Sequence, residues 1–403
     1  MNTPTKTLAL WLALTPLLCE PQLHAADPPP PAKGAIRIAT YNVAMYRDRA
    51  GQLSEELASG DSAQAKQIAE VIQRVRPHAL LLCEIDFDPK ATAPRWFANE
   101  YLTQPQAPGL EGVTYEHLFT APVNTGEPTG LDLNSDGSTN GPNDCYGYGR
   151  YPGQYGMAVL SRLPIDLKAS RTFQQLLWSQ LPDARRPIVP STGAPYYSDA
   201  IWPKLRLPSK SLFDVVLTLP GGQPLHLVCS HPTPPVFDGP EDSNGCRNAD
   251  EVRLVTEYLA GALPDYFVDD SGRRGSIAPG EPLVVLGDLN ADPTDGNGIR
   301  SAINDLIASP RLAPDPAPRS RGALEASHAH PQLNSPHQGD PSLDTGDFGP
   351  DGHANLRIDY ALPSADLRVL ASGVYWPAPG EPGAEAVTAS DHRMVWVDVS
   401  IGD

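Results

Sequence analysis

Several apolar segments of this chain stop abruptly at a carboxylate, an amide or an imidazole. Residues 282–287 are followed by Asp288 and Asn290. Residues 225–230 are followed by His231. Buried strands that end in such groups place them at one edge of a sheet, where ligands bind. Each group alone has an ordinary explanation, as a turn former, a core imidazole or a surface residue, but their recurrence at strand ends predicts a functional site. The candidates are Asn42, Glu84, His231, Asp288, Asn290, Asp359, Asp391 and His392.

These residue types suit the hydrolysis of a phosphate ester. Mg²⁺ and Mn²⁺ prefer oxygen ligands and keep several waters, so one or two carboxylates can hold such an ion. Cleavage then needs an aligned water, a base to deprotonate it and positive charge on the phosphoryl oxygens. The candidates do not show the closely spaced His and Cys pattern that is typical of zinc. We therefore expect Mg²⁺ or Mn²⁺ as the cofactor.

The elements that must position these side chains are short strands separated by turn residues. Apolar residues at helical spacing predict one helix over residues 62–75, which Pro77 ends, and another over about 248–263. Many strands, few helices and a continuous spread of site residues favour one domain over residues 35–403, an α/β fold built as a four-layered α/β sandwich in which helices flank two packed, mainly antiparallel sheets. Strands are expected at residues 35–41, 78–83, 157–161, 213–219, 225–230, 283–287, 358–362 and 394–399.

At these positions the chain resembles the endonuclease/exonuclease/phosphatase superfamily, which includes DNase I-like nucleases, apurinic endonucleases, sphingomyelinases and inositol-polyphosphate phosphatases. The matching segments occur in the family's order and span nearly the whole chain. They are residues 38–43 (IATYNV), 82–85 (LCEI), 155–162 (YGMAVLSR), 230–232 (SHP), 287–290 (GDLN), 357–360 (RIDY) and 390–392 (SDH). The resemblance implies that Glu84 is the principal metal ligand, with Asn42 and Asp391 nearby.

The resemblance also implies catalytic roles for five positions. His392, oriented by Asp359, would act on the attacking water or on the phosphoryl group. Asp288 would help to deprotonate or position the nucleophile. Asn290 would hold a phosphate oxygen, and His231 would stabilise the opposite phosphoryl oxygen or assist the leaving group. The pairing of an imidazole with a carboxylate has a physical reason of its own, because the carboxylate fixes the tautomer and favours the protonated ring.

One position departs from the family pattern. In DNase I-like nucleases the histidine that corresponds to His231 has a carboxylate partner from the segment that matches residues 153–155. Here that segment offers the neutral Gln154. We therefore expect His231 to be held less readily as an imidazolium, which argues against a general-acid role for it.

Several further residues have both a functional and a structural interpretation. Arg150, Arg206, Lys210 and Arg247 are candidates for contact with a substrate phosphate, and a surface or structural role is the alternative for each. The run from Asp132 through Asn134 to Asp136 matches the opening of a calcium-binding loop, although its twelfth position is an asparagine rather than a glutamate. An Asx-rich turn is the alternative explanation, so Ca²⁺ at this loop is a structural hypothesis.

The N-terminus predicts export. An apolar run after Lys6 and a small residue at Ala25 indicate a signal peptide over residues 1–25, followed by a solvated proline-rich leader over residues 26–34. Cys19 leaves a lipid-anchored form as the alternative. Secretion or a periplasmic location would favour a disulfide between the loop residues Cys145 and Cys246, and no transmembrane segment is expected in the mature chain.

The composition favours some classes of substrate over others. The net charge is −18, and no basic run of the kind that binds nucleic acid directly is present. This favours a small-molecule or lipid phosphodiester over nucleic acid, with an extracellular DNase I-like nuclease as the alternative. A binding module on the same fold, without catalysis, is a third hypothesis, which the set of carboxylates and histidines disfavours. No obligate protein partner is evident.

Overall fold

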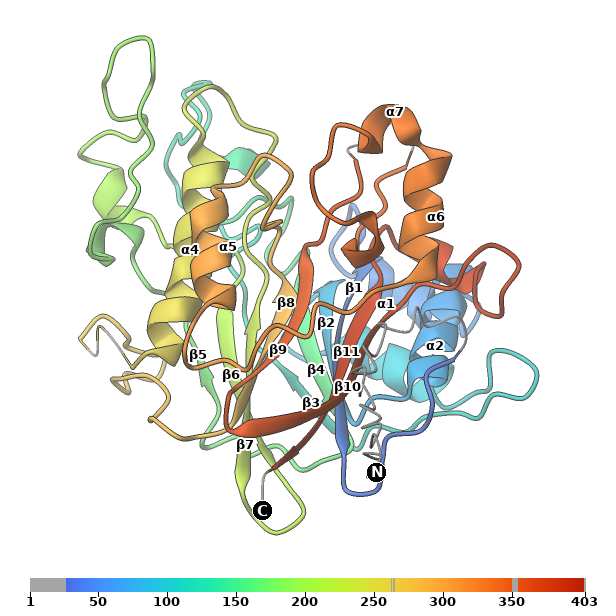
Figure 1. Cartoon of the computed structure of the whole chain (residues 1–403). Coiled ribbons are helices and arrows are strands. Elements are labelled where there is room, and N and C mark those ends of the chain that lie inside the picture. The colour runs from blue at the N-terminus through green and yellow to red at the C-terminus, as the bar shows by residue number, and fades with distance from the viewer. Residues whose placement is uncertain (1–26, 262, 264, 350–353, 402–403) are drawn as a thin grey trace, which may run out of the picture.

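Two packed β-sheets form the centre of the molecule (Figure 1). The computed structural model describes residues 27–261, 263, 265–349 and 354–401, so the predicted signal peptide lies outside the described residues. The six-stranded sheet has the order β10-β11-β1-β2-β4-β3 and the five-stranded sheet the order β5-β6-β7-β8-β9. Their strands are β1 (Ile36–Met45), β2 (Ala79–Ile85), β3 (His117–Thr120), β4 (Met157–Ser161), β5 (Arg171–Thr172), β6 (Leu212–Thr218), β7 (Pro224–Ser230), β8 (Leu283–Asp288), β9 (Asp359–Pro363), β10 (Leu367–Tyr375) and β11 (Met394–Ile401).

Helices cover the outer faces of both sheets. In Figure 1, α4 and α5 lie against the five-stranded sheet, whereas α1 and α2 lie on the far side of the six-stranded sheet. The four-layered α/β sandwich predicted from the sequence is confirmed. The helices are α1 (Gln52–Leu57), α2 (Ala63–Val75), α3 (Thr92–Trp96), α4 (Ser243–Leu259), α5 (Arg300–Ile307), α6 (Arg321–Ala329) and α7 (Pro331–Asn334), with a π-helical turn at Phe97–Tyr101 and 3₁₀ turns at Pro142–Asp144, Trp178–Gln180, Trp202–Lys204, Pro341–Leu343 and Ala386–Ala389.

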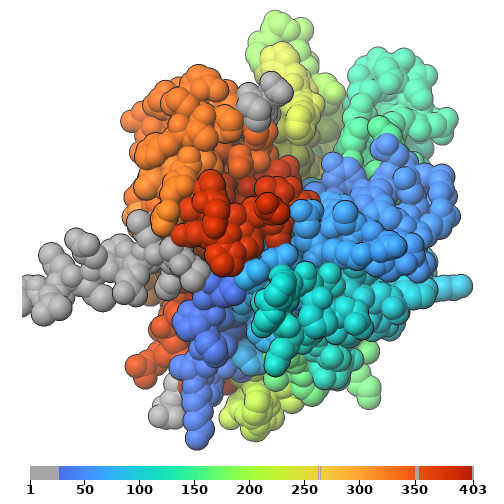
Figure 2. Space-filling model, turned by 90° about the vertical axis from the view of Figure 1, so that its right-hand side faces the viewer, coloured from blue at the N-terminus to red at the C-terminus, as the bar shows by residue number. Residues whose placement is uncertain are grey.

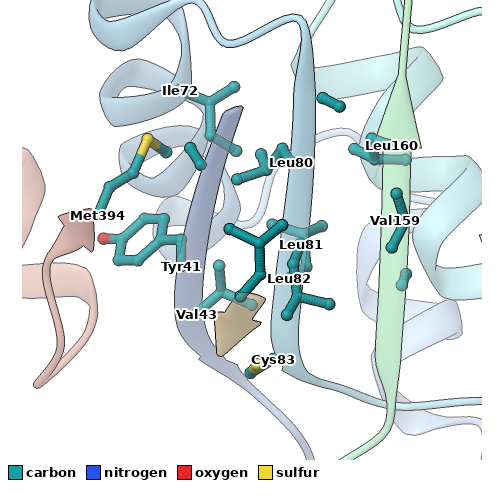
Figure 3. Close-up of a cluster of buried hydrophobic side chains, with 14 of the residues drawn as sticks. Tyr41, Val43, Ile72, Leu80, Leu81, Leu82, Cys83, Val159, Leu160 and Met394 are labelled. Carbon is teal, nitrogen blue, oxygen red and sulfur yellow. The ribbon is translucent and has the colours of Figure 1, made fainter. Parts of the chain in front are cut away.

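The alternation of side chains along the strands explains the layers. In β6, Phe213, Val215 and Leu217 belong to the core between the two sheets, whereas Leu212 belongs to the core beneath α4 and α5. Successive strand residues point to opposite faces, so a strand with both faces apolar must be covered on both sides. Figure 3 shows part of the hydrophobic core packed on the six-stranded sheet, where Tyr41 lies near Met394 of β11 and Leu80 lies near Ile72 of α2.

Local signals set the ends of the helices. Ser62 caps α2 by accepting a hydrogen bond from the Ala65 amide, and the helix ends where Arg76 turns left-handed before Pro77. This helix agrees with the one predicted over residues 62–75. The second predicted helix begins earlier, because α4 starts at Ser243 rather than at about residue 248.

Two other segments differ from the expectation. Strand β1 does not stop at Asn42 but continues to Met45, with a register shift and a left-handed residue, Ala44, after Asn42. The described part of the proline-rich leader is mostly exposed, yet Arg37 Nη2 donates a 2.8 Å hydrogen bond to the Pro29 carbonyl.

In Figure 2 the segment that carries α6 and α7, in orange, forms a lobe beside the red C-terminal part of the chain. None of the described helices is long and apolar enough to cross a bilayer.

Candidate active site at the strand ends

Two parallel strand pairs bring four predicted side chains to one edge of the two packed sheets, which we call the rim. β1 pairs in parallel with β2, and β7 pairs in parallel with β8. Asn42 and Glu84 lie near the ends of β1 and β2, His231 directly follows β7, and Asp288 ends β8. Because the carboxyl ends of parallel strands lie at the same edge of a sheet, these side chains meet where the two sheets face each other.

Two antiparallel neighbours complete the rim. Asp359, the first residue of β9, pairs in register with Asp288. His392 lies just before β11, with its Nδ1 2.9 Å from Asp359 Oδ2 and its Nε2 3.6 Å from Asp288 Oδ2. Burial alone would lower the pKa of His392, but the charges of the two carboxylates raise it well above its usual value. The ring is therefore held as an imidazolium between them.

Asp288 lies at the centre of this arrangement. Asn42 Nδ2 donates a 3.0 Å hydrogen bond to Asp288 Oδ2, and the Asn290 amide donates a 2.9 Å hydrogen bond to Oδ1. Burial would raise the pKa of Asp288, but the charge of His392 and the proximity of His231 lower it below its usual range. The preceding Gly287 permits the close approach of β8 to β7, since a Cβ there would lie 1.8 Å from the Ser230 carbonyl oxygen.

Glu84 is a carboxylate without a hydrogen-bond donor among the described residues. Its backbone is left-handed, with φ 58°, and its Oε1 lies 3.8 Å from His231 Nε2, which is too far for a hydrogen bond. Burial first, and then the charge of Asp391, raise the pKa of Glu84 to about 7, while His392 opposes them. Asp391 itself is exposed. A mostly buried carboxylate beside a second one and without a donor is a typical place for a cation.

His231 has no carboxylate partner at its Nδ1 among the described residues. Its Nδ1 is buried without a hydrogen-bond partner, and its Nε2 lies 3.4 Å from Asp288 Oδ2. Burial and then the charge of Lys210 lower the pKa of His231 to about 4, so this ring is neutral at pH 7. Gln154 is directed elsewhere, because its amide donates to the Arg47 carbonyl and its oxygen accepts from the Arg150 amide.

Lys210 and Asn290 share a contact beside these histidines. Asn290, left-handed at φ 49°, donates a 3.1 Å hydrogen bond to the Pro232 carbonyl, and Lys210 Nζ lies 3.5 Å from the same oxygen. Burial lowers the pKa of Lys210, and the charges of Glu251, Glu84 and Asp288 oppose that shift. Of the four cations proposed from the sequence, Lys210 is the one placed among the site carboxylates.

The three arginines from that proposal are occupied by other contacts. Arg150 forms a 2.6 Å ion pair with Asp48. Arg206 donates a 2.7 Å hydrogen bond to Asn124 Oδ1 and packs 4.1 Å from the centre of the Tyr146 ring. Arg247 lies on α4 rather than in a loop and donates to backbone carbonyls, including that of Leu207 at 2.9 Å. Each of these contacts is the structural alternative that the sequence left open.

The predicted calcium loop closes on itself. Asp132 accepts hydrogen bonds from the amides of Asp136 and Gly137, and Asn134 Nδ2 donates to Asp136 Oδ2 at 2.9 Å. These are the bonds of an Asx-rich turn, which satisfies the side chains without an ion. Ca²⁺ binding at this loop stays a prediction.

The predicted disulfide is wrong for this structure. Cys145 and Cys246, like the buried Cys83 and Cys229, are free thiols. Cys145 Sγ faces the carbonyls of Gly141 and Gly149, at 3.7 and 3.6 Å. Cys246 lies in the first turns of α4 and packs against the core beneath that helix. Because Cys246 is on a helix rather than in a loop, its side chain is directed by helical packing.

Sequence reasoning missed Thr345 and a pair of tyrosines. Thr345 Oγ1 donates a 2.8 Å hydrogen bond to Asp359 Oδ2 and so supports the Asp359–His392 pair. The rings of Tyr46 and Tyr155 lie in tilted contact with their centres 4.5 Å apart, and the charge of Glu84 contributes to the raised pKa of each. Tyr155 lies in a segment that matches the family, which was the available signal. Thr345 lies in a loop without any such signal.

The rim fits a divalent cation. Asp288, Asp359 and His392 each offer a ligand atom, all within 4.8 Å of one another, and Asp359 Oδ1 is buried without a partner. The His392 ring is nevertheless engaged with Asp359, so this trio also has a sufficient explanation as a proton network. Glu84, which has no donor, is the better principal ligand, and oxygen donors of this kind suit Mg²⁺ or Mn²⁺.

Comparison with known proteins finds one family model and several similar structures. The sequence model of the Endonuclease/Exonuclease/phosphatase family matches residues 39–392. The structure is similar to an endonuclease/exonuclease/phosphatase from Beutenbergia cavernae DSM 12333, with 20% identity, 91% of this chain and 72% of that chain covered and a TM-score of 0.49. It is also similar to the human Nocturnin catalytic domain (15% identity, 92% and 96% covered, TM-score 0.43) and to sphingomyelinase C from Streptomyces griseocarneus (14%, 90% and 99%, 0.42). No curated protein matches the chain.

Proposed function

The chain belongs to the endonuclease/exonuclease/phosphatase family, and from that premise we propose that it is a divalent-metal-dependent phosphoesterase that hydrolyses phosphate mono- or diesters by attack of an activated water. The observation that carries the proposal is the buried chain of Asp359, His392 and Asp288 beside a Glu84 carboxylate that has no hydrogen-bond donor in the described residues. Buried polar groups without partners are costly, so their concentration at one rim indicates a ligand that completes them.

Glu84 would hold Mg²⁺ or Mn²⁺, together with Asn42 and Asp391, and the ion would supply positive charge to the phosphoryl oxygens. Asn42 Oδ1 already accepts a 3.1 Å hydrogen bond from the Ala44 amide, which leaves one lone pair for a further contact. Burial keeps the Glu84 carboxylate poorly hydrated, so an ion at this position replaces little water.

Five side chains of the protein provide the other interactions with the water and the phosphoryl group. Asp288, which stays ionised, accepts a hydrogen bond from the attacking water and orients it. His392, held as an imidazolium, donates from Nε2 toward the phosphoryl group. Lys210 adds a second positive charge on the side of His231, which is itself neutral and acts as a hydrogen-bond donor rather than as an acid. Asn290 holds a further phosphate oxygen.

Within this class a small-molecule or lipid phosphodiester is the favoured substrate, and an extracellular DNase I-like nuclease is the alternative. The net charge of −18 and the engagement of Arg150, Arg206 and Arg247 in internal contacts leave little basic surface to follow a nucleic-acid backbone. A binding module without catalysis is disfavoured, because it has no use for an imidazolium between two buried carboxylates.

A substrate panel tests the proposal. The purified mature protein should release p-nitrophenol from bis-p-nitrophenyl phosphate or p-nitrophenyl phosphate with Mg²⁺ or Mn²⁺, and EDTA should abolish the release. Nicking of supercoiled plasmid at a comparable rate would select the nuclease instead. If no ester in the panel, lipids included, is cleaved with any of Mg²⁺, Mn²⁺ or Ca²⁺, the proposal fails.

We also propose that the protein acts outside the cytoplasm, because its first 25 residues have the pattern of a signal peptide. Mass spectrometry of the protein from the periplasm or the culture medium should find a mature N-terminus near Ala26. A full-length chain confined to the cytoplasm would contradict export, without bearing on the chemistry.

A further inference from the structure

Two buried side chains of α4 hold the loops on the Lys210 side of the rim. Glu251 is 4% exposed and Asn248 is 1% exposed. They lie three residues apart and therefore share one face of the helix. The proposed hydrolysis places neither of them at the substrate. The Glu251 carboxylate forms no ion pair with a described residue, and backbone amides alone satisfy it.

Each oxygen of the Glu251 carboxylate accepts a hydrogen bond from a different loop. Oε1 accepts from the Ser209 amide at 2.5 Å, and Oε2 accepts from the Thr233 amide at 2.7 Å. Ser209 directly precedes Lys210, and Thr233 lies two residues after His231. A carboxylate suits this place because it only accepts hydrogen bonds, whereas a glutamine would turn its own N–H donors toward one of these amides.

The amide of Thr233 is the only backbone donor within residues 232–235. Its neighbours Pro232, Pro234 and Pro235 have no N–H group. The N–H of Thr233 and the carbonyl of Pro232 belong to one trans peptide, so they point in opposite directions. The hydrogen bond to Glu251 therefore directs the Pro232 carbonyl away from that carboxylate.

The Pro232 carbonyl is the oxygen that Lys210 and Asn290 share. Asn290 Nδ2 donates to it at 3.1 Å, and Lys210 Nζ lies 3.5 Å from it. Neither side chain has another hydrogen bond to a described residue. The orientation of this one carbonyl therefore decides where the polar ends of both side chains lie.

Two further contacts strengthen the hold of α4 on this side. Asn248 Nδ2 donates to the Thr233 carbonyl at 2.9 Å and to the Leu289 carbonyl at 3.0 Å, so it joins the loop after β7 to the loop after β8. Burial lowers the pKa of Lys210, and the charge of Glu251 is the largest of those that oppose this shift. Glu251 thus stabilises both the position and the charge of Lys210.

Other elements hold the metal-binding side of the rim. Among the described residues, no hydrogen bond joins α4 to Glu84, Asp359 or His392. Asp359 and His392 are held by each other and by Thr345 instead. A change in α4 should therefore disturb one side of the site and leave the other intact.

We propose that Glu251 is a positioning residue for Lys210 and Asn290. By fixing the peptide between Pro232 and Thr233, it places their polar ends for contact with the substrate phosphate. Glu251 itself does not touch the substrate. This role rests on the proposed phosphoesterase function, because it belongs to the same site.

A neighbouring carboxylate on α4 provides a matched control. Asp250 is fully buried and accepts hydrogen bonds from Trp178 Nε1 at 2.8 Å and from the Arg185 amide at 2.7 Å, neither of which belongs to the rim. Glu251→Gln and Asp250→Asn each replace a buried carboxylate by an amide, so both should lower Tm, by on the order of 3 °C. If Glu251 only stabilised the fold, the two variants would behave alike in every assay of folded protein.

Ligand binding distinguishes the two variants without any turnover. The affinity for Mn²⁺ is measured by electron paramagnetic resonance, and the affinity for inorganic phosphate by calorimetry at saturating Mg²⁺. Glu251→Gln should bind phosphate roughly tenfold more weakly, the effect of one weakened charged contact, and should bind Mn²⁺ within about twofold of the unchanged protein. Asp250→Asn should keep both affinities. Unchanged phosphate binding in Glu251→Gln, or an equal loss of Mn²⁺ binding, would overturn the proposal.

Turnover of the best ester in the panel gives a second readout. Glu251→Gln should lower kcat/KM at least about tenfold per folded molecule, because Lys210 and Asn290 are no longer held in place. Added to Lys210→Met, the same change should have a smaller effect than it has alone, since one of its two targets is already gone. Effects that multiply in full would contradict an action through Lys210.

Two outcomes that could be confused are kept apart by these measurements. If the unchanged protein binds phosphate but cleaves no ester, the proposed hydrolysis fails, and the phosphate titration still decides the role of Glu251. If Glu251→Gln does not fold, Asn248→Ala provides the same test, because it removes the other contact of α4 with this loop. Asn248→Ala should weaken phosphate binding and leave Mn²⁺ binding unchanged, and the reverse pattern would contradict the proposal.

Discussion

The five-stranded sheet carries two buried polar clusters, which differ in whether their polar atoms have hydrogen-bond partners within the protein. Beneath α4, Asp214 Oδ1 lies 2.7 Å from His226 Nδ1, and Tyr258 donates a 2.7 Å hydrogen bond to Asp214 Oδ2. Both carboxylate oxygens of this cluster therefore have partners. At the rim, by contrast, Nδ1 of His231 and Oδ1 of Asp359 are buried without any.

This difference separates stability from function. A buried hydrogen-bonded network stabilises the fold and is expensive to break, because the partners of a deleted group are left unpaired. A buried group that the protein leaves unpaired costs free energy unless a ligand completes it. Mutations in the Asp214 cluster should therefore act on folding, and mutations at the rim should act on turnover.

The largest effect is expected at the rim itself. Glu84→Gln and His392→Gln should each lower kcat/KM by at least about a hundredfold, on the scale of a lost catalytic group. The free energy of unfolding of Glu84→Gln should stay level or rise, because a poorly hydrated carboxylate is replaced by a neutral amide. Turnover with the best ester of the panel and urea denaturation measure the two quantities. Near-normal turnover in either variant would remove that residue from the mechanism.

In the Asp214 cluster beneath α4 we expect a loss of stability without a change in turnover. Asp214→Ala should lower the free energy of unfolding by about 2 kcal/mol, since His226 and Tyr258 lose their acceptor inside the protein. Asp214→Asn, which keeps an acceptor for Tyr258, should cost less and serves as the matched control. Because the cluster does not face the rim, kcat per folded molecule should not change. A loss of turnover that exceeds the loss of folded protein would contradict the separation of the two regions.

A smaller effect is expected for Lys210, which is buried like the Asp214 cluster but placed at the rim. Lys210→Met keeps the length of the side chain and removes its charge, so kcat/KM should fall roughly tenfold, equivalent to about 1.4 kcal/mol. The fold should be preserved, because burial of a charge is removed as well. The control is Lys204→Met, whose lysine is exposed. Equal kinetics for the two variants would exclude Lys210 from phosphate binding.

The sequence predicted the fold and the rim for the same reason. Apolar runs that end in Glu84, His231 or Asp288 are local patterns, and the parallel pairing of their strands then brings these ends together. The predicted strand at 283–287 matches β8 within one residue, and the predicted helix at 62–75 matches α2 closely.

The sequence could not predict which partners each side chain would find. Arg247 was placed in a loop, but α4 begins upstream of it and directs its guanidinium to backbone carbonyls. The same early start places Cys246 on the helix, so the expected disulfide with Cys145 does not form. Thr345 owes its role to a loop that reaches Asp359 from elsewhere in the chain. Such contacts depend on tertiary geometry, which spacing along the chain does not encode.

The smallest predicted effect is a pH dependence in the satisfied cluster. Burial alone would lower the pKa of His226, but the hydrogen bond to Asp214 raises it above its usual value. A raised pKa in the folded state means that the folded protein binds the proton more tightly, so the stabilisation is complete below about pH 6.5 and is lost as the pH rises through the folded pKa. His226→Gln should therefore be destabilised relative to the unchanged protein by about 1 kcal/mol more at pH 5.5 than at pH 9, measured by urea denaturation. The difference should persist in the Glu84→Gln background, because the cluster titrates independently of the rim. A destabilisation that is equal at both pH values would mean that the pKa of His226 is the same in the folded and the unfolded protein, and that its contribution to the cluster comes from packing rather than from charge.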